Sequence, residues 1–182
     1  QQEERKRTCC PLPRAKRANR TAIERNGIAL QDGKARAWAK NQMKREIPEQ
    51  LRNPDFRFAI VKKNEKQPYE PKWNTDNCYM CFEPKLLNHL IKLGNVAAIC
   101  GYGGLIVIDF DNADYQLKKA NLLPKTFVCK SAGKGLKHFY YILKGDMISK
   151  IGIGLDRRLC DIQADKSPIT CPPSTINRKS YD

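Results

Sequence analysis

Two aspartates separated by one residue, Asp109 and Asp111, follow an apolar run over residues 105–108. Side chains alternate across a strand, so both carboxylates are predicted to project from the same face. Burying an unpaired carboxylate is costly, and one or two divalent cations held between the pair would offset that cost. The simpler interpretation is a pair of turn or capping aspartates at the end of a strand.

A segment rich in glycine, serine and lysine follows downstream, at residues 130–137, and leads into a strand that opens with His138. Glycine lets a backbone approach an anion closely, and N–H and ammonium groups bind phosphate. Ser131, Lys134, Lys137 and His138 are therefore predicted to form a triphosphate cradle. The pattern is not a Walker loop. Taken alone, a histidine at the head of an aromatic strand also fits a purely structural role.

A third carboxylate, Asp161, lies in a short alternating segment, and Asp156 and Asp165 compete with it for the same role. Nucleotidyl transfer with two metal ions requires such acids, because one cation activates the attacking 3′ hydroxyl and the other steadies the triphosphate. Ser174, which follows two prolines, is a candidate for contact with nucleotide or template.

From Phe56 onward the sequence consists of short β-branched and aromatic runs separated by helix-like segments, a pattern that is typical of an α+β fold. The predicted strands and loops of this region carry the candidate site residues. A helix is predicted over residues 83–93, with its leucines on one side. Residues 96–101 and 105–110 are predicted to be adjacent strands joined by a tight hairpin at 102–104. The other strands are predicted over residues 58–63, 127–130, 138–143, 161–164 and 169–171. The expectation is six to eight strands in a mixed or antiparallel sheet with flanking helices, not a doubly wound parallel sheet.

Residues 1–55 are predicted to form a basic, mainly helical N-terminal extension that precedes a catalytic domain at 56–182. Helix-forming residues dominate 22–51, but the apolar ones are too loosely spaced for a single amphipathic stripe. The extension is either a solvated helical segment or an arm that follows phosphate groups.

The composition limits the classes of protein. The chain has 182 residues with 34 Lys and Arg against 19 Asp and Glu, a net charge of +15. Such a balance favours nucleic acid as a partner, with an anionic membrane surface as the weaker alternative. No apolar run approaches the roughly 20 residues that span a bilayer, and no apolar core follows the basic start as in a signal peptide. We therefore expect an intracellular, cytoplasmic protein with no membrane partner.

The eight cysteines are spread along the chain. Four lie in apolar runs and are predicted to be buried free thiols: Cys100, Cys129, Cys160 and Cys171. Cys78 and Cys81 have the spacing of half a zinc site, which Cys9, Cys10 or His89 would have to complete. A single such pair is more often incidental, so structural zinc is the less favoured interpretation.

In this order, the motifs resemble the primase-polymerase (prim-pol) domain of plasmid and virus replication proteins, in the archaeo-eukaryotic primase superfamily. The resemblance covers roughly residues 56–182. It rests on the run from Asn95 to Asp111, the loop before His138, Asp161, the Pro-Pro-Ser sequence ending at Ser174, and a lead-in with Lys66, Pro68, Lys72 and Trp73. The chain departs from the family where Gly135-Leu136-Lys137 precedes His138 and where Glu70-Pro71 stands before the tryptophan region.

The resemblance implies an RRM-related catalytic core that makes DNA primers and strands from nucleoside triphosphates on a single-stranded DNA template. It further implies that Asp109, Asp111 and Asp161 bind Mg or Mn and that His138 binds the incoming nucleotide. A helicase domain or another replication partner would accompany it in a longer protein. Trp73, Tyr102 and Tyr140 are candidates for stacking on bases.

Two other functions compete with a primase-polymerase. One is a catalytically silent domain that binds single-stranded nucleic acid, and the other is a metal-dependent nuclease or phosphohydrolase that uses the same acids. The sequence favours nucleotidyl transfer because the acids and the phosphate-binding loop occur together in one short span, which neither competing function requires.

Overall fold

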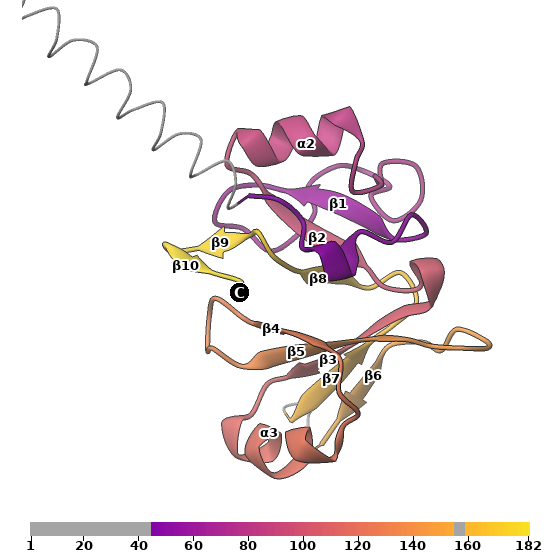
Figure 1. The fold of residues 1–182 in the computed structure, drawn as a ribbon, viewed down its shortest axis with the longest axis vertical. Helices are drawn as coiled ribbons and strands as arrows, with labels where there is room; N and C mark the ends of the chain where they lie inside the picture. The colour runs from indigo at the N-terminus through magenta and orange to yellow at the C-terminus, as the bar shows by residue number, and fades with distance from the viewer. Residues whose placement is uncertain (1–44, 155–158) are drawn as a thin grey trace, which may run out of the picture. The chain divides into compact units, whose positions relative to one another are not determined.

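The structure, a computed structural model, describes residues 45–154 and 159–182, which form two antiparallel β-sheets and a terminal hairpin (Figure 1). The smaller sheet has the strand order β1-β2-β8, and the larger sheet has the order β4-β5-β3-β7-β6. The α+β class with antiparallel sheets is thus confirmed. None of the helices in this part of the chain is long and apolar enough to cross a membrane.

The smaller sheet consists of β1 (Arg57–Val61), β2 (Asn95–Ile99) and β8 (Pro168–Thr170). Every residue of β2 is buried, as expected for a central strand covered on both faces. The predicted helix is α2 (Pro84–Ile91), which begins with proline at a position where no backbone donor is lost and buries Leu86 and Leu90.

The larger sheet has β3 (Leu105–Phe110) at its centre, between β5 (Lys137–Ile142) and β7 (Cys160–Gln163). Its outer strands are β4 (Phe127–Lys130) and β6 (Ile151–Ile153). Helix α3 (Ala113–Lys119) follows β3 directly, and the Asn112 side chain caps it by accepting a hydrogen bond from the Tyr115 backbone N–H. The remaining elements are β9 (Thr175–Ile176), β10 (Lys179–Ser180) and the short 3-10 helices Glu49–Leu51, Tyr102–Gly104 and Ala120–Leu122.

The hairpin predicted at residues 102–104 is wrong, because β2 and β3 belong to different sheets. Gly101, Gly103 and Gly104 do adopt positive φ, but they carry the chain from one sheet to the other. A Cβ on Gly103 would lie 2.9 Å from the Phe56 ring, so the crossing is also tightly packed. Apolar periodicity identifies two strands here without showing whether they pair. The predicted strand number was also too low, since ten strands occur in the described ranges, several of only two or three residues.

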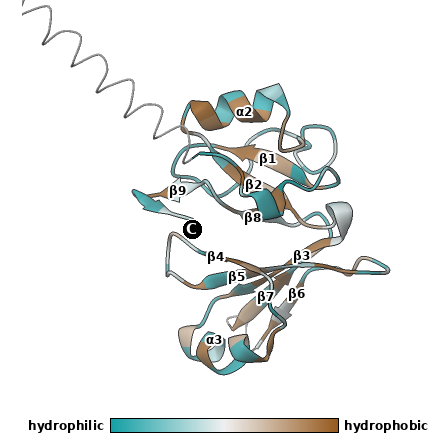
Figure 2. Cartoon of the chain, viewed as in Figure 1, coloured by the Kyte–Doolittle hydropathy of each residue, from teal (hydrophilic) through white to brown (hydrophobic). Residues whose placement is uncertain are grey.

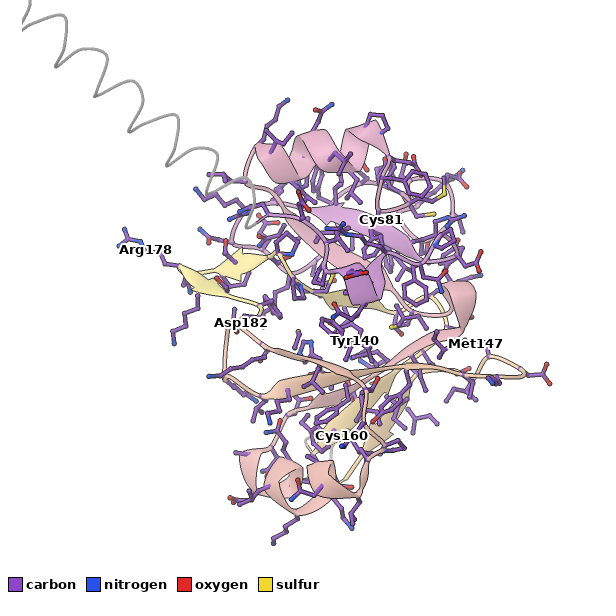
Figure 3. All side chains as sticks on the ribbon, viewed as in Figure 1. Cys81, Tyr140, Met147, Cys160, Arg178 and Asp182 are labelled. Carbon is purple, nitrogen blue, oxygen red and sulfur yellow. The ribbon has the colours of Figure 1, made fainter. Side chains whose placement is uncertain are left out.

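Two apolar clusters lie on opposite faces of the larger sheet. One joins Val107 and Tyr140 to Phe58, Val96 and other residues of the smaller sheet, so the two sheets pack face to face. The other contains Phe110, Phe139 and Cys160, and residues in and after α3 pack against it. Figure 3 shows Tyr140 in the layer between the sheets and Cys160 nearer to α3. In Figure 2 the strands are largely hydrophobic, whereas α2 carries both hydrophobic and hydrophilic residues.

The four cysteines predicted to be buried free thiols are buried and free. Cys78 Sγ donates to the Thr75 carbonyl, and His89 Nε2 lies 2.8 Å from the Val61 carbonyl, so neither side chain is directed to a shared ion. In the described ranges no group of three or more His, Cys, Asp or Glu residues is arranged to hold a metal. Cys9 and Cys10 lie outside these residues.

Most of the predicted N-terminal extension also lies outside the described residues. Of its last part, Ile47 and Leu51 are buried in the core between the sheets. Arg45 donates to the carbonyl of Gly94 and to the hydroxyl of Thr175, so this part of the chain is packed against the smaller sheet and the terminal hairpin.

Candidate active site

Asp109, His138 and Asp161 form a row across the three central strands of the larger sheet. Asp109 on β3 pairs with His138 on β5 and with Asp161 on β7. Directly opposed residues of antiparallel strands project from the same face, so all three side chains point the same way. Strand alternation places Val107 and Tyr140 on the same face, and these two residues pack against the smaller sheet. We call these three residues the cross-strand row.

Asp109 and His138 form the first contact in this row, with 3.1 Å between Asp109 Oδ1 and His138 Nε2. The His138 side chain is only 5% exposed. Burial alone lowers the pKa of His138, but the hydrogen bond to Asp109, the negative charge of that carboxylate and the nearby Cys129 outweigh it and raise the pKa to about 9. His138 is therefore an imidazolium at neutral pH, and its buried Nδ1 has no hydrogen-bond partner among the described residues.

Asp161 makes its closest contact with Lys150, whose Nζ lies 2.6 Å from Asp161 Oδ2. Gln163 Nε2 approaches the same oxygen at 3.4 Å. The other oxygen, Asp161 Oδ1, is buried and has no hydrogen-bond partner in the described part of the chain. An unsatisfied buried carboxylate oxygen costs stability, and such a group commonly marks a place where an ion or a water molecule binds.

Asp111 lies just beyond β3, where its backbone N–H still donates to the Leu159 carbonyl beside β7. Its pKa is raised, first by burial and then by the negative charge of Asp109 and, more weakly, of Asp161. Lys134 counteracts this shift, with its Nζ 3.9 Å from Asp111 Oδ1 and 3.2 Å from the Asp111 carbonyl. The three carboxylates are thus close enough to influence one another.

Asp109 and Asp111 line a cleft of about 450 Å³ between the two sheets. The loop after β4 contributes Ser131, Gly133 and Lys134, and the smaller sheet contributes residues 167–170. Lys66 enters from the segment after β1, and a Cβ on Gly133 would lie 3.7 Å from its ammonium group. The cleft is therefore lined by two carboxylates, Asp109 and Asp111, and by the lysines Lys66, Lys134 and Lys150, while Asp161 is paired with Asp109 across the strands.

Tyr181, which follows the terminal hairpin, closes one side of the cleft. Its ring centroid is 5.8 Å from that of His138, and the residue is buried. Burial, and then the charge of Asp109, raise the pKa of Tyr181 to about 12, so its hydroxyl stays protonated. Its backbone N–H donates to the Ser174 carbonyl, which fixes this segment beside the smaller sheet.

One predicted cradle residue, Lys137, and the other candidate for nucleotide contact, Ser174, do not line the cleft. Lys137 precedes His138 on β5, and strand alternation directs its side chain to the opposite face of the sheet. Ser174 is fully buried, and its hydroxyl accepts from the Val96 N–H and donates to the Val96 carbonyl. Neither residue lines the cleft, whereas Ser131, Lys134 and His138 do.

Of the other acids and aromatic residues predicted from sequence, those that the structure describes do not line the cleft. Asp165 is exposed and does not line it, and Asp156 lies outside the described residues. Tyr140, a candidate for base stacking, is buried between the sheets. Trp73 and Tyr102 are partly exposed but are not among the cleft residues.

Sequence patterns did not identify Lys150, Gln163 and Tyr181 as cleft residues. Gln163 could have been found, because it lies two residues after Asp161 on the same strand and so shares its face. Lys150 precedes a three-residue strand with no clear alternation, and Tyr181 reaches the cleft only through the path of the terminal hairpin.

The donor set fits hard divalent cations, which prefer carboxylate oxygens. Asp109 and Asp111 line the cleft, and Asp161, paired with Asp109 across the strands, offers a buried oxygen without a partner in the described residues. Their side chains are not gathered into a ready metal cluster in this part of the chain, and each carboxylate faces a cationic side chain instead. Binding of an ion would therefore require these contacts to rearrange.

A family model described as "Bifunctional DNA primase/polymerase, N-terminal" matches residues 9–182. The match includes the whole cleft and also most of the segment predicted to be a separate extension. No curated protein matches the chain in sequence.

Proposed function

The chain belongs to the bifunctional DNA primase/polymerase family, and we propose that it joins nucleotides from nucleoside triphosphates to a primer or to an initiating nucleotide. A single-stranded DNA template would direct the reaction. The observation that carries this proposal is that Asp109, Asp111 and the glycine-rich loop before His138 line one cleft, and that Asp161 is paired with Asp109 across the strands.

Mg or Mn ions bound by Asp109, Asp111 and Asp161 would activate the attacking 3′ hydroxyl and offset charge on the triphosphate. The positions of the acids support this assignment. Asp109 and Asp161 are held by the hydrogen-bonded ladder of the sheet, so their relative placement is fixed before any ligand binds. Asp111 is less constrained because it lies past the end of β3.

The other side of the cleft is suited to a polyanion. Lys66, Lys134 and Lys150 supply ammonium groups, and Ser131 and Gly133 supply hydroxyl and backbone donors. His138 lines the cleft as a buried cation, so its positive charge would favour a phosphate group there. We assign these residues to the incoming nucleotide.

The two competing functions are less well supported. A silent binding domain would gain nothing from a buried, unpartnered oxygen on Asp161 beside two other carboxylates. A nuclease would use the acids but does not need a glycine-rich loop and three lysines around the same cleft. Template, primer and nucleoside triphosphates are the partners that the proposal requires; a helicase partner and a plasmid or virus context remain predictions.

The test is a primer-extension assay on primed and unprimed single-stranded DNA with labelled nucleotides and Mg or Mn. Asp109→Asn and Asp161→Asn should each lower product formation by about 10³-fold, because each removes a ligand charge. Asp165→Asn is the matched control, since this nearby carboxylate is exposed and is not paired with Asp109 across the strands. Template binding without any product would favour the silent domain, and shortening of the DNA would favour the nuclease.

A further inference from the structure

Asp109, Asp111 and Asp161 each have a cationic side chain of the protein as a neighbour. Asp109 contacts His138, Asp161 contacts Lys150, and Asp111 lies beside Lys134. The Lys150 contact is the shortest of the three, at 2.6 Å against 3.1 and 3.9 Å. Like charges at close range repel, so these cations stabilise the three acids when no metal ion is bound.

Lys150 differs from His138 in its freedom to move. His138 is fixed in strand β5 and buried, whereas the Lys150 side chain is 41% exposed and precedes β6, a three-residue outer strand. Residues 143–150 have no helix or strand. A lysine ammonium is a compact charge on a flexible four-carbon chain, so it can leave Asp161 without any change in the sheet.

We propose that Lys150 is an exchangeable internal counter-cation, which neutralises Asp161 in the metal-free protein and moves to the triphosphate when a divalent ion and a nucleotide bind. An ammonium group 2.6 Å from Asp161 Oδ2 competes directly with an ion for that carboxylate. The triphosphate offers it a new partner within the same cleft, which Lys150 lines. The inference rests on the proposed function, because it requires a metal ion and a nucleotide in this cleft.

Opposite effects on two ligands follow from this exchange. Without nucleotide, Lys150 opposes metal binding, so its removal should tighten the binding of the ion. With the ion present, Lys150 favours the nucleotide, so its removal should weaken nucleotide binding. Binding of the two ligands is coupled reciprocally, and Lys150 should account for part of that coupling. A lysine that only packs against the sheet would produce neither effect.

The test begins with titration of the full chain with Mn²⁺ alone, with free Mn²⁺ measured by electron paramagnetic resonance. Lys150→Met should bind Mn²⁺ about three- to tenfold more tightly than the native chain. Lys150→Arg keeps the charge and should remain near the native value. Lys144→Met is the control, because Lys144 is exposed and lies outside the cleft. Unchanged or weaker Mn²⁺ binding by Lys150→Met overturns the inference.

The second arm measures the affinity for a non-hydrolysable nucleoside triphosphate analogue at saturating Mn²⁺. Lys150→Met should bind it about three- to tenfold more weakly, and Lys144→Met should match the native chain. Tighter Mn²⁺ binding with unchanged nucleotide affinity overturns the transfer to the triphosphate. Asp161→Asn separates the two proposals: if it leaves native Mn²⁺ binding unchanged, the metal site itself is wrong and both proposals fall. If Asp161→Asn abolishes Mn²⁺ binding, the metal site stands, and the results for Lys150→Met alone decide whether the role proposed for Lys150 is right.

Discussion

Asp109 and Asp161 are direct cross-strand partners on β3 and β7, so two carboxylates lie next to each other on one face of the sheet. Like charges in such a position destabilise a sheet. The protein offsets this with His138 on the other side of Asp109 and with Lys150 beside Asp161. These two carboxylates require nearby positive charge because the layer between the sheets is otherwise apolar. The contribution of that charge to the free energy of unfolding can be measured.

The stability of the metal-free protein should depend on the protonation of His138. The pKa of His138 is about 9 in the folded chain and about 6.5 when unfolded, so its contribution is complete below pH 6.5 and is lost as the pH rises to 9. The free energy of unfolding should fall across this window by up to about 1.4 kcal/mol per pH unit. Urea unfolding in EDTA at pH 6, 7.5 and 9 measures this slope. His138→Gln should flatten it, and parallel curves for both chains would contradict the assignment.

Lys134 and Lys137 provide a matched pair of variants that tests the proposed nucleotide site. Lys134 lines the cleft, whereas Lys137 projects from the other face of the sheet. Lys134→Met should raise the KM for nucleoside triphosphate by about three- to tenfold, because an ammonium partner of the phosphates is lost. Lys137→Met should leave it unchanged. Steady-state kinetics of primer extension measure both, and equal effects would place the triphosphate elsewhere.

Ser174 and Ser131 should separate a structural serine from a binding serine. Ser174→Ala removes both hydrogen bonds to the Val96 backbone, and it should lower the free energy of unfolding by about 1–3 kcal/mol without changing the KM for nucleotide. Ser131→Ala should raise the KM for nucleotide without changing the free energy of unfolding, because this residue lines the cleft. Urea unfolding and steady-state kinetics on both variants test the pair. A raised KM in Ser174→Ala at full stability would restore the role predicted from sequence.

Asn95 should be a strong contributor to the stability of the cleft wall. It is fully buried; its amide donates to the carbonyls of Glu65 and Thr175, and its oxygen accepts from the Thr175 N–H. It therefore ties β2 to the segment before Lys66 and to the terminal hairpin. Asn95→Ala should lower the free energy of unfolding by about 2–4 kcal/mol, because buried backbone groups lose their partners. Hydrogen exchange at Thr175 should accelerate in parallel; unchanged protection there would show that Asn95 does not hold the hairpin.

Strand alternation accounts for the part of the site that sequence predicted. Asp109 and Asp161 lie on short apolar strands and His138 opens an aromatic one, so their positions in the sheet follow from local pattern. The same rule, applied to Lys137, would have excluded it from the cleft. Alternation says nothing about pairing between strands, which is why the hairpin at residues 102–104 was wrong.

The remaining cleft residues depend on long-range packing. Lys150 reaches Asp161 because β6 pairs with β7, and Tyr181 reaches His138 because the terminal hairpin passes beside the smaller sheet. Neither contact leaves a local trace in the sequence. The contacts of Ser174 could not be predicted for a related reason, since a hydroxyl near a predicted site can equally satisfy a buried backbone, here that of Val96.

The cross-strand row also provides a way to measure, in a refolding experiment, what fraction of molecules have the correct strand register. A slip of one residue in β5, β3 or β7 would move His138, Asp109 or Asp161 to the face covered by α3. Such a chain would still have its strands, so its far-ultraviolet circular dichroism would match that of the native protein. It would lack a complete set of acids at the proposed metal site, however, so the molar ratio of Mn²⁺ bound there at saturation would count the correctly aligned molecules in a refolded preparation.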